Sequence, residues 1–311
     1  MNRLPVKRLP VLALLTVLLA GCTSPAAKPG PVSAIVATTS VGRVDQLTVS
    51  SPAIGRRATV WVMKPKGWTQ GSRDWPVLYL LHPCCGEPDG WLTGGNAEKL
   101  TAGLKAVVIM PEASPMGWYT DWVQGPAWER FHLTELRALL EPRYGLGTYR
   151  VIAGSSMGGL GAMLYAARNP GMFQAAASLS GVLDTQLDQP GQARFINDNG
   201  GDTRRMWGED WTAHNPRALA AKLRNVRLFV SAGNDKPGPF DQGKAGNGSE
   251  LSILRQSESF ATAATRAGAR VTTDFYGPGT HTWEYWSRGL SRAMPTLFPG
   301  TWTGRPGQPV K

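Results

Sequence analysis

The chain has 311 residues and a formal net charge of +11 at pH 7, a length that suits one large domain or two small ones. Nucleic acid is one partner for so basic a protein, but no run of Lys and Arg interleaved with aromatic residues appears, so we expect no nucleic-acid partner. A slight preference for anionic envelope lipids fits the charge, and general solubility is its simplest use.

The first 22 residues have the layout of a bacterial export signal. Residues 1–8 carry three basic side chains, residues 9–20 are apolar, and the segment ends in Leu-Ala-Gly-Cys22. The apolar run is too short to span a membrane. Its ending resembles the lipobox of bacterial lipoproteins, which implies a signal peptide over residues 1–21 and a lipid on Cys22; an ordinary signal peptide with a chance cysteine is the alternative. We therefore predict an extracytoplasmic protein held in the cell envelope by a membrane anchor.

Strand-like and helix-like segments alternate through the rest of the chain. Residues 22–42, rich in Ser, Thr, Ala and Pro, predict a flexible tether, and the residues from 299 predict a disordered tail. Strands are expected as a hairpin within 43–63 and at 75–82, 105–110, 149–153, 175–180, 225–232 and 271–275, and helices at 128–140, 250–267 and 282–294. The alternation predicts an α/β domain over 43–298, with a mostly parallel sheet covered by helices on both faces. Residues 181–219 are long for a plain loop and are expected to form an inserted cap.

One turn has the layout of a nucleophile elbow. A β-rich run at 149–153 leads into Gly154–Gly158, and a helical pattern with apolar residues three and four apart follows. A strand, a G-x-S-x-G turn and a helix in this order predict the α/β-hydrolase fold, with the central serine as nucleophile. Only Ser156 has glycines two residues before and two after it, so Ser156 is the predicted nucleophile.

The serine needs a base, which follows it in the chain of this fold. Of the four histidines, His82 and His132 precede the serine and are excluded by this order. His281 follows the last expected strand, where the fold places its base, whereas His214 lies in the expected cap. We therefore predict His281 as the base.

The acid that orients this base has two candidates. Asp235 lies in the loop after the strand at 225–232, the usual place in this fold. Glu250 begins the next helix, where an acid also complements the helix dipole. The residues alone favour Asp235 and leave Glu250 as its rival.

The oxyanion of a tetrahedral intermediate needs two N–H donors. One is expected from Met157, just after the nucleophile, and the other from the loop after strand 75–82. Pro83 has no N–H, so Cys84 or Cys85 must donate. Adjacent cysteines close only a strained eight-membered ring, because their Cα atoms lie about 3.8 Å apart. A vicinal disulfide and two free thiols are equally open.

Beyond the elbow, several motifs resemble those of one family. From residue 44 to 297 the chain is similar to the putative-esterase family of α/β-hydrolases, and within it to the actinobacterial mycolyltransferase branch and its esterase relatives. The stretches that carry the resemblance are Trp118–Trp122, the elbow with Ser178–Ser180, Met206–Gly208, Asn215–Pro216 and Thr280–Trp286. The last, Thr-His-x-Trp-x-Tyr-Trp, is the most specific.

The resemblance implies a Ser–Glu–His triad with Glu250 as the acid, which reverses the preference for Asp235. It also implies Cys84 as the oxyanion donor, Trp283 in the pocket beside the base, and acyl transfer through an acyl-Ser156 intermediate to a sugar hydroxyl or water. Where the trehalose-using transferases have an Asp and an Arg, this chain has His82 and Cys85 in the substrate pocket, so both polar sugar contacts are missing.

The predicted function is that of a lipid-anchored serine esterase or acyltransferase acting on acyl esters or glycolipids, without a metal or cofactor. One alternative is a mycolyltransferase that uses trehalose or other sugars as acceptor. A second alternative is a non-catalytic surface binding protein of the same fold, although such members lose the nucleophile or the base, and here Ser156, Glu250 and His281 are all present.

Overall fold

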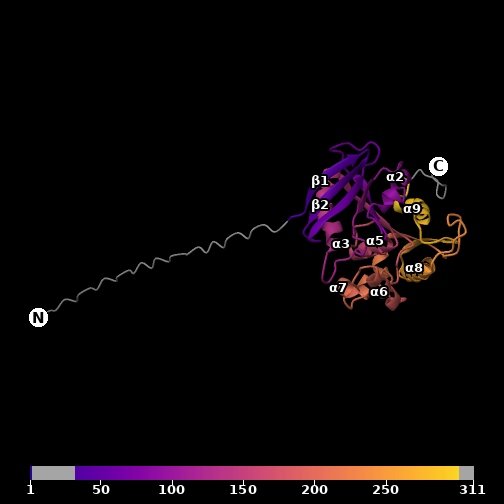
Figure 1. Cartoon of the computed structure of the whole chain (residues 1–311). Coiled ribbons are helices and arrows are strands. Elements are labelled where there is room, and N and C mark those ends of the chain that lie inside the picture. The colour runs from indigo at the N-terminus through magenta and orange to yellow at the C-terminus, as the bar shows by residue number, and fades with distance from the viewer. Residues whose placement is uncertain (2–31, 301–311) are drawn as a thin grey trace. The chain divides into compact units, whose positions relative to one another are not determined.

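The computed structural model of the protein describes Met1 and residues 32–300 (Figure 1). The predicted signal peptide, Cys22, the first part of the expected tether and the tail beyond residue 300 lie outside the described residues. Among the residues that are described, no helix is long and apolar enough to cross a membrane.

Residues 34–277 contribute all strands of one nine-stranded sheet, in the order β1-β2-β3-β5-β4-β6-β7-β8-β9. Its strands are β1 (Ala34–Val41), β2 (Val44–Ser51), β3 (Arg56–Met63), β4 (Trp75–Leu81), β5 (Val107–Pro111), β6 (Leu146–Ser155), β7 (Ala175–Leu179), β8 (Arg227–Gly233) and β9 (Arg270–Gly277). Following the order in the sheet, neighbouring strands from β5 to β9 are parallel. The pairs β1–β2, β2–β3 and β3–β5 are antiparallel. The mostly parallel sheet expected from the sequence is confirmed.

The edge strand β1 corrects one expectation. Ala34–Val41 was expected to belong to the flexible tether, but it pairs antiparallel with β2 along its length. The segment AIVATTSV is rich in β-branched residues, which favour strands. Most of its side chains are exposed, so no alternation of buried and exposed residues marks it in the sequence.

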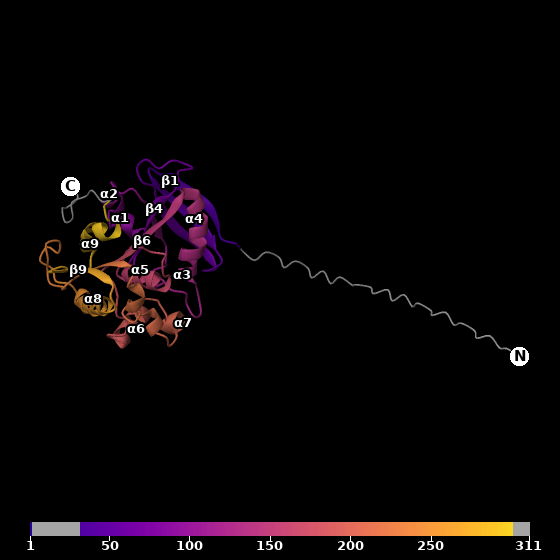
Figure 2. The same ribbon diagram turned by 180° about the vertical axis from the view of Figure 1, so that it is seen from behind.

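A layer of helices covers each face of the sheet. Successive side chains of a strand point to opposite faces, so each strand contributes to both layers of packing. In β4, Tyr79 and Leu81 pack into one cluster with helices α3 to α5, while Leu78 and Leu80 pack into another with α1, α2 and α9. Figure 2 shows the sheet between these layers from behind. The helices are α1 (Gly90–Thr93), α2 (Ala97–Leu100), α3 (Trp128–Arg130), α4 (Leu136–Tyr144), α5 (Met157–Arg168), α6 (Gln189–Asp198), α7 (Thr203–Trp207), α8 (Ser249–Arg266) and α9 (Trp283–Leu297).

The segment 181–219 holds α6, α7 and a short 3₁₀ turn (Thr212–His214). Its buried side chains, among them Leu183, Ile196 and Trp207, join the cluster on the α5 face of the sheet. The segment therefore packs onto the domain as structured chain, and its role as a cap stays a prediction.

Candidate active site

Ser156 lies at a sharp turn between β6 and α5. Its backbone has φ 52° and ψ −118°, a conformation that costs energy for any residue other than glycine. The strand and helix pack too closely here for larger residues: a Cβ on Gly154 would lie 2.3 Å from the Gly158 carbonyl oxygen, and one on Gly158 would lie 2.4 Å from the Leu81 carbonyl oxygen. The two glycines therefore permit the turn that presents the Ser156 side chain, which is 7% exposed.

Ser156, His281 and Glu250 form a continuous chain of hydrogen bonds. A carboxylate can only accept, so Nδ1–H of His281 donates to Oε2 of Glu250 at 2.6 Å. In the neutral ring Nε2 is then the acceptor, and the Ser156 hydroxyl donates to it at 2.9 Å. Ser156 lies in the β6–α5 turn, His281 in the loop after β9 and Glu250 at the start of α8.

The second oxygen of Glu250 is held by three donors. Oε1 accepts from the Ser180 hydroxyl at 2.7 Å, from the Gly233 N–H at 2.7 Å and from the Tyr276 hydroxyl at 3.2 Å. Glu250 is fully buried, and a buried carboxyl group needs such hydrogen-bond partners to offset the loss of water. The donors also fix the carboxylate plane, and with it the direction in which Oε2 faces His281.

Asp235, the acid favoured by its place in the loop after β8, is bonded to other loops and not to His281. Its carboxylate accepts from the N–H of Gly248, and its own N–H donates to the Gly279 carbonyl at 3.0 Å. These bonds tie the loop before α8 to the loop before His281. The imidazole of His281 donates to Glu250 instead, the residue implied by the family resemblance.

The loop after β4 contributes one backbone donor that faces no other residue's acceptor. Cys85 N–H donates to the Pro115 carbonyl at 3.2 Å, whereas within residues 32–300 the N–H of Cys84 has no acceptor on another residue and interacts with its own thiol. Met157 N–H, in the first turn of α5, lacks an intrahelical partner, as the first N–H groups of every helix do. Among the described residues, the two donors named from the sequence, Met157 and Cys84, thus have no backbone acceptor on another residue.

The two cysteines of this loop are free thiols whose sulfur atoms touch at 2.6 Å. Cys84 is half-buried, and Cys85 is exposed. Burial raises the pKa of the Cys84 thiol, and the neighbouring thiol raises it further.

His82, named from the sequence as a pocket residue, is in the interior of the protein. It is 1% exposed. Its Nδ1–H donates to the Pro83 carbonyl at 2.7 Å, and its Nε2 accepts from the Ala113 N–H at 2.9 Å. Burial lowers the pKa of His82 to about 4, so the ring is neutral and braces the loop that carries the cysteines.

His214, the other histidine that follows Ser156, is separated from this site. Its Nδ1 lies 2.9 Å from both the Thr120 hydroxyl and the Arg168 guanidinium, and its ring stacks on Trp207. Burial and the nearby Arg168 charge lower its pKa to about 4. These contacts give His214 a structural role, in line with the prediction of His281 as the base.

The aromatic residue that touches the His281 ring is Trp286, with ring centroids 4.8 Å apart and planes at 80°. Trp283, expected beside the base, packs one ring further out, edge to face with Trp286 at 5.0 Å and with Trp91 at 5.1 Å. It lies against Gly90 of α1 and against Gly94, the residue after that helix, and a Cβ at either position would collide with the indole. One helical turn separates the two tryptophans, so the Thr-His-x-Trp-x-Tyr-Trp motif contained both.

Three residues of the site were missed as functional candidates: Ser180, Tyr276 and Trp286. Ser180 and Trp286 lie inside stretches that carried the family resemblance, so position within those motifs was an available signal. Tyr276 is near the end of β9, and no sequence pattern ties it to Glu250.

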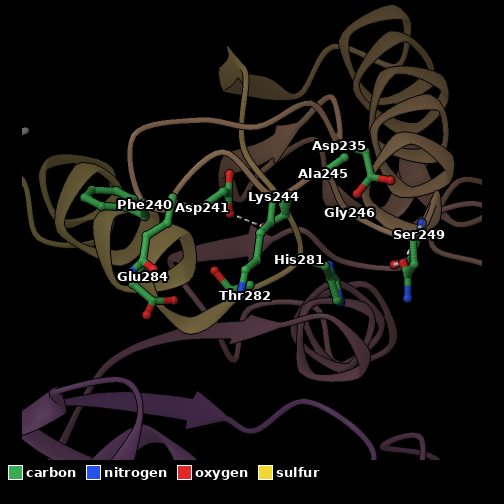
Figure 3. Close-up of a pocket in the computed structure, with 13 residues that line it drawn as sticks. Asp235, Phe240, Asp241, Lys244, Ala245, Gly246, Ser249, His281, Thr282 and Glu284 are labelled. Atoms are coloured by element: carbon green, nitrogen blue, oxygen red, sulfur yellow. Dashed lines mark hydrogen bonds between the residues drawn. The ribbon is translucent and has the colours of Figure 1, made fainter.

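A cavity of about 630 Å³ opens beside His281 (Figure 3). It lies between the loop 235–249 and residues 280–284, and its lining includes the charged side chains of Asp241, Lys244 and Glu284. Ser156 is not among the residues that line it. The cavity therefore borders the imidazole from the side of the loop before α8.

Comparison with known proteins identifies the family. The profile of the family described as "Putative esterase" matches residues 51–297. The chain belongs to this family. The esterase-family protein is 32% identical over 247 residues to Esterase Rv1288 of Mycobacterium tuberculosis, covering 70% of this chain but about half, 51%, of that relative's length. It is also 30% identical to the diacylglycerol acyltransferase/mycolyltransferase Ag85A of the same organism, covering 90% of each chain.

Solved structures place the esterase-family protein in the α/β-hydrolase fold. Mycobacterium tuberculosis MPT51 matches with a TM-score of 0.72 and 26% identity, over 83% of this chain and 98% of that one. The Staphylococcus aureus fluorophosphonate-binding serine hydrolase FphF matches with a TM-score of 0.66 over 82% and 97% of the chains. At 21% identity, the second match concerns the fold alone.

Proposed function

We propose that the protein is a serine esterase or acyltransferase that acts on acyl esters through an acyl-Ser156 intermediate, with His281 as base and Glu250 as the acid of the triad. The observation that carries this proposal is the unbroken series of hydrogen bonds from Ser156 through His281 to Glu250. The esterase family supports the same chemistry.

In the first half-reaction the Ser156 hydroxyl gives its proton to Nε2 of His281 while Oγ attacks the ester carbonyl carbon. The carbonyl oxygen becomes an oxyanion, which the N–H groups of Met157 and Cys84 stabilise by hydrogen bonds. His281 then returns the proton to the alkoxy oxygen as the carbon–oxygen bond breaks. The alcohol leaves, and the acyl group remains on Ser156.

In the second half-reaction His281 accepts a proton from water or from an acceptor hydroxyl, whose oxygen attacks the acyl-enzyme carbonyl. Collapse of the second tetrahedral intermediate returns the proton to Ser156 Oγ and releases acid or a new ester. Glu250 stabilises the imidazolium in both halves by accepting from Nδ1–H.

Transfer to a sugar hydroxyl is the second candidate for this half-reaction, with mycolyl transfer as its most specific form. Its support is the similarity to Ag85A, named as a mycolyltransferase, and the polar cavity beside His281, whose charged and amide side chains suit a hydroxyl-rich molecule. Trp283 and the exposed Cys85 are proposed at the rim of the substrate pocket. We further propose that the enzyme is exported and anchored to the membrane by a lipid on Cys22.

The test is turnover of p-nitrophenyl butyrate and covalent labelling by a fluorophosphonate, in the wild-type protein and in Ser156→Ala. We expect turnover and labelling in the first and neither in the second. A folded wild-type protein that shows neither is the binding protein of the alternative reading, and the enzyme proposal then fails. A screen of short-chain esters and trehalose mycolates, with and without free sugar, decides between water and sugar as acceptor.

A further inference from the structure

We propose that Cys84 and Cys85 form a reversible thiol–disulfide site whose state sets the rigidity of the oxyanion loop. The proposal concerns two adjacent side chains whose sulfur atoms already touch, at 2.6 Å. Its covalent step is independent of the proposed function, and only its kinetic consequence rests on it.

The backbone around the pair is held on both sides. Before the pair, the His82 ring bonds to the Pro83 carbonyl and the Ala113 N–H, and the His82 carbonyl accepts from the Tyr119 hydroxyl at 3.0 Å. After it, Cys85 N–H is bonded to the Pro115 carbonyl, and Cys85 has a left-handed φ of 65°. This frame holds the two sulfur atoms close together, which favours ring closure despite the strain of the product.

The two thiols differ in access, which sets the order of the chemistry. Cys85 is exposed, whereas Cys84 packs against the core cluster and burial raises the pKa of its thiol. The Cys85 thiolate attacks one sulfur of a low-molecular-weight disulfide and releases one thiol. Cys84 Sγ, losing its proton to solvent, then attacks Cys85 Sγ and releases the second thiol. Two cysteine thiols are oxidised to one disulfide, and the oxidant disulfide is reduced to two thiols.

The product is suited to reversal. Adjacent residues have Cα atoms about 3.8 Å apart, closer than in ordinary disulfides. Such a strained and partly exposed disulfide is more easily reduced than a structural one. Reduction therefore returns the pair to thiols under mild conditions.

The consequence for the site follows from the position of the ring. The eight-membered ring would contain the Cys84 Cα and the Cys85 amide, which is one peptide unit from the Cys84 N–H proposed as oxyanion donor. Closing it restricts ψ of Cys84 and φ of Cys85, the backbone torsions that follow the peptide unit carrying this N–H, and so stiffens the loop around the donor. Preorganised donors stabilise the transition state more than mobile ones. We expect the disulfide form to have the higher kcat, with KM little changed.

The experiment uses the full chain with Cys22→Ser, which leaves the pair as the only cysteines. The protein is incubated with oxidised glutathione and then with a dithiol reductant. At each stage the intact mass, the number of free thiols and the kcat on a short-chain ester are measured. The matched control adds Cys85→Ser, which cannot close the ring and keeps the Cys84 N–H.

After oxidation we expect a protein lighter by two hydrogen atoms and without free thiols. Reduction should restore both thiols and lower kcat by about 10-fold at most, less than the ~10²–10³-fold cost of removing an oxyanion donor. The kcat of the control, whatever its absolute value, should be the same after oxidised glutathione and after the reductant.

A glutathione adduct in place of the mass loss, or two free thiols after oxidation, would overturn the covalent step. A complete disulfide with unchanged kcat would overturn the kinetic link. If no form hydrolyses esters or takes up a fluorophosphonate, the proposed function fails, while the mass and thiol count still decide the chemistry of the pair.

Discussion

The Tyr276 hydroxyl donates to Oε1 of Glu250 at 3.2 Å, so a side chain on β9 helps to hold the carboxylate that faces His281. The ring of Tyr276 stacks on Tyr285 with 1° between the planes, and the Tyr285 hydroxyl donates to Asp241 at 2.7 Å. Asp241 also accepts from the Thr280 hydroxyl, next to the base. The acid and the loop of the base are therefore attached to one pair of stacked rings.

Tyr276→Phe should lower kcat by about threefold to tenfold, because one neutral hydrogen bond contributes about 1 kcal/mol. Without this donor the Glu250 carboxylate is held by two donors instead of three, so its Oε2 faces Nδ1–H of His281 less steadily, and kcat should fall while KM changes little. The measurement is kcat and KM on a short-chain ester. Tyr285→Phe is the control: it loses the hydrogen bond from Tyr285 to Asp241 but leaves the one from Tyr276 to Glu250, so its kcat should fall less. Equal losses of kcat in the two variants would contradict a positioning role for the Tyr276 hydroxyl.

Glu250→Gln should lower kcat by about 10³–10⁴-fold, because the amide cannot hold the imidazole tautomer that accepts from Ser156. Asp235→Asn should cost little by comparison, since its carboxylate bonds to a loop N–H and not to His281. Steady-state kinetics of both variants, with circular dichroism to verify folding, make the comparison. A large loss confined to Asp235→Asn would reverse the assignment of the acid.

Gly158→Ala should destabilise the fold by about 1–3 kcal/mol, since the new Cβ meets a backbone carbonyl that cannot rotate away. The clash is with the Leu81 oxygen, at 2.4 Å. Gly103→Ala is the control, because a Cβ there has nothing within 4 Å and the backbone is not left-handed. Urea unfolding measures both. Equal free energies of unfolding would show that β4 and α5 are not so close in solution.

Acid should destabilise the protein through its buried histidines. Burial lowers the pKa of His82 to about 4 and that of His132 to about 3, so both fold as neutral rings. Their contribution is complete above the unfolded pKa of about 6.5 and is lost as pH falls below it, by about 2 kcal/mol per histidine at pH 5. Asp45 and Asp241, whose pKa values are lowered from 3.8 by hydrogen bonds, lose their contribution only at lower pH.

Urea unfolding between pH 7 and pH 5 measures this loss. His132→Gln removes one of the three rings whose pKa burial lowers, the others being His82 and His214. Its free energy of unfolding should therefore fall about a third less steeply with pH. An unchanged slope would mean that His132 is not a neutral buried ring in the folded protein.

Cys22→Ala should abolish partitioning of the protein into a detergent phase, because it removes the proposed site of lipid attachment. The wild type expressed in a bacterium that processes lipoproteins should partition into detergent, and Cys85→Ser should behave like it. A wild-type protein found in the aqueous phase would contradict the anchor.

Features that depend on neighbours in the chain were predicted well from the sequence. The elbow at Ser156, the strands from β4 to β9 and the helix that begins beside Glu250 follow from local turn chemistry and hydrophobic periodicity, which are read within a few residues. The edge strand β1 was not predicted, because its mostly exposed side chains show no alternation of buried and exposed positions. The sequence also did not predict that Trp286, and not Trp283, contacts His281, because the two tryptophans lie one turn apart on the same helix.

By itself, the sequence determined which serine and which histidine are the candidates for nucleophile and base, since the order of these residues along the chain is fixed by the fold's connections. For the acid, the residues alone favoured Asp235 and the family resemblance favoured Glu250; only the tertiary structure shows which of the two carboxylates is bonded to the imidazole. Both lie near the carboxyl end of β8, and the outcome depends on which carboxylate the Ser180, Gly233 and Tyr276 donors hold against the imidazole. Those donors come from three strand ends that are adjacent only because the strands are parallel, an arrangement without a local sequence pattern.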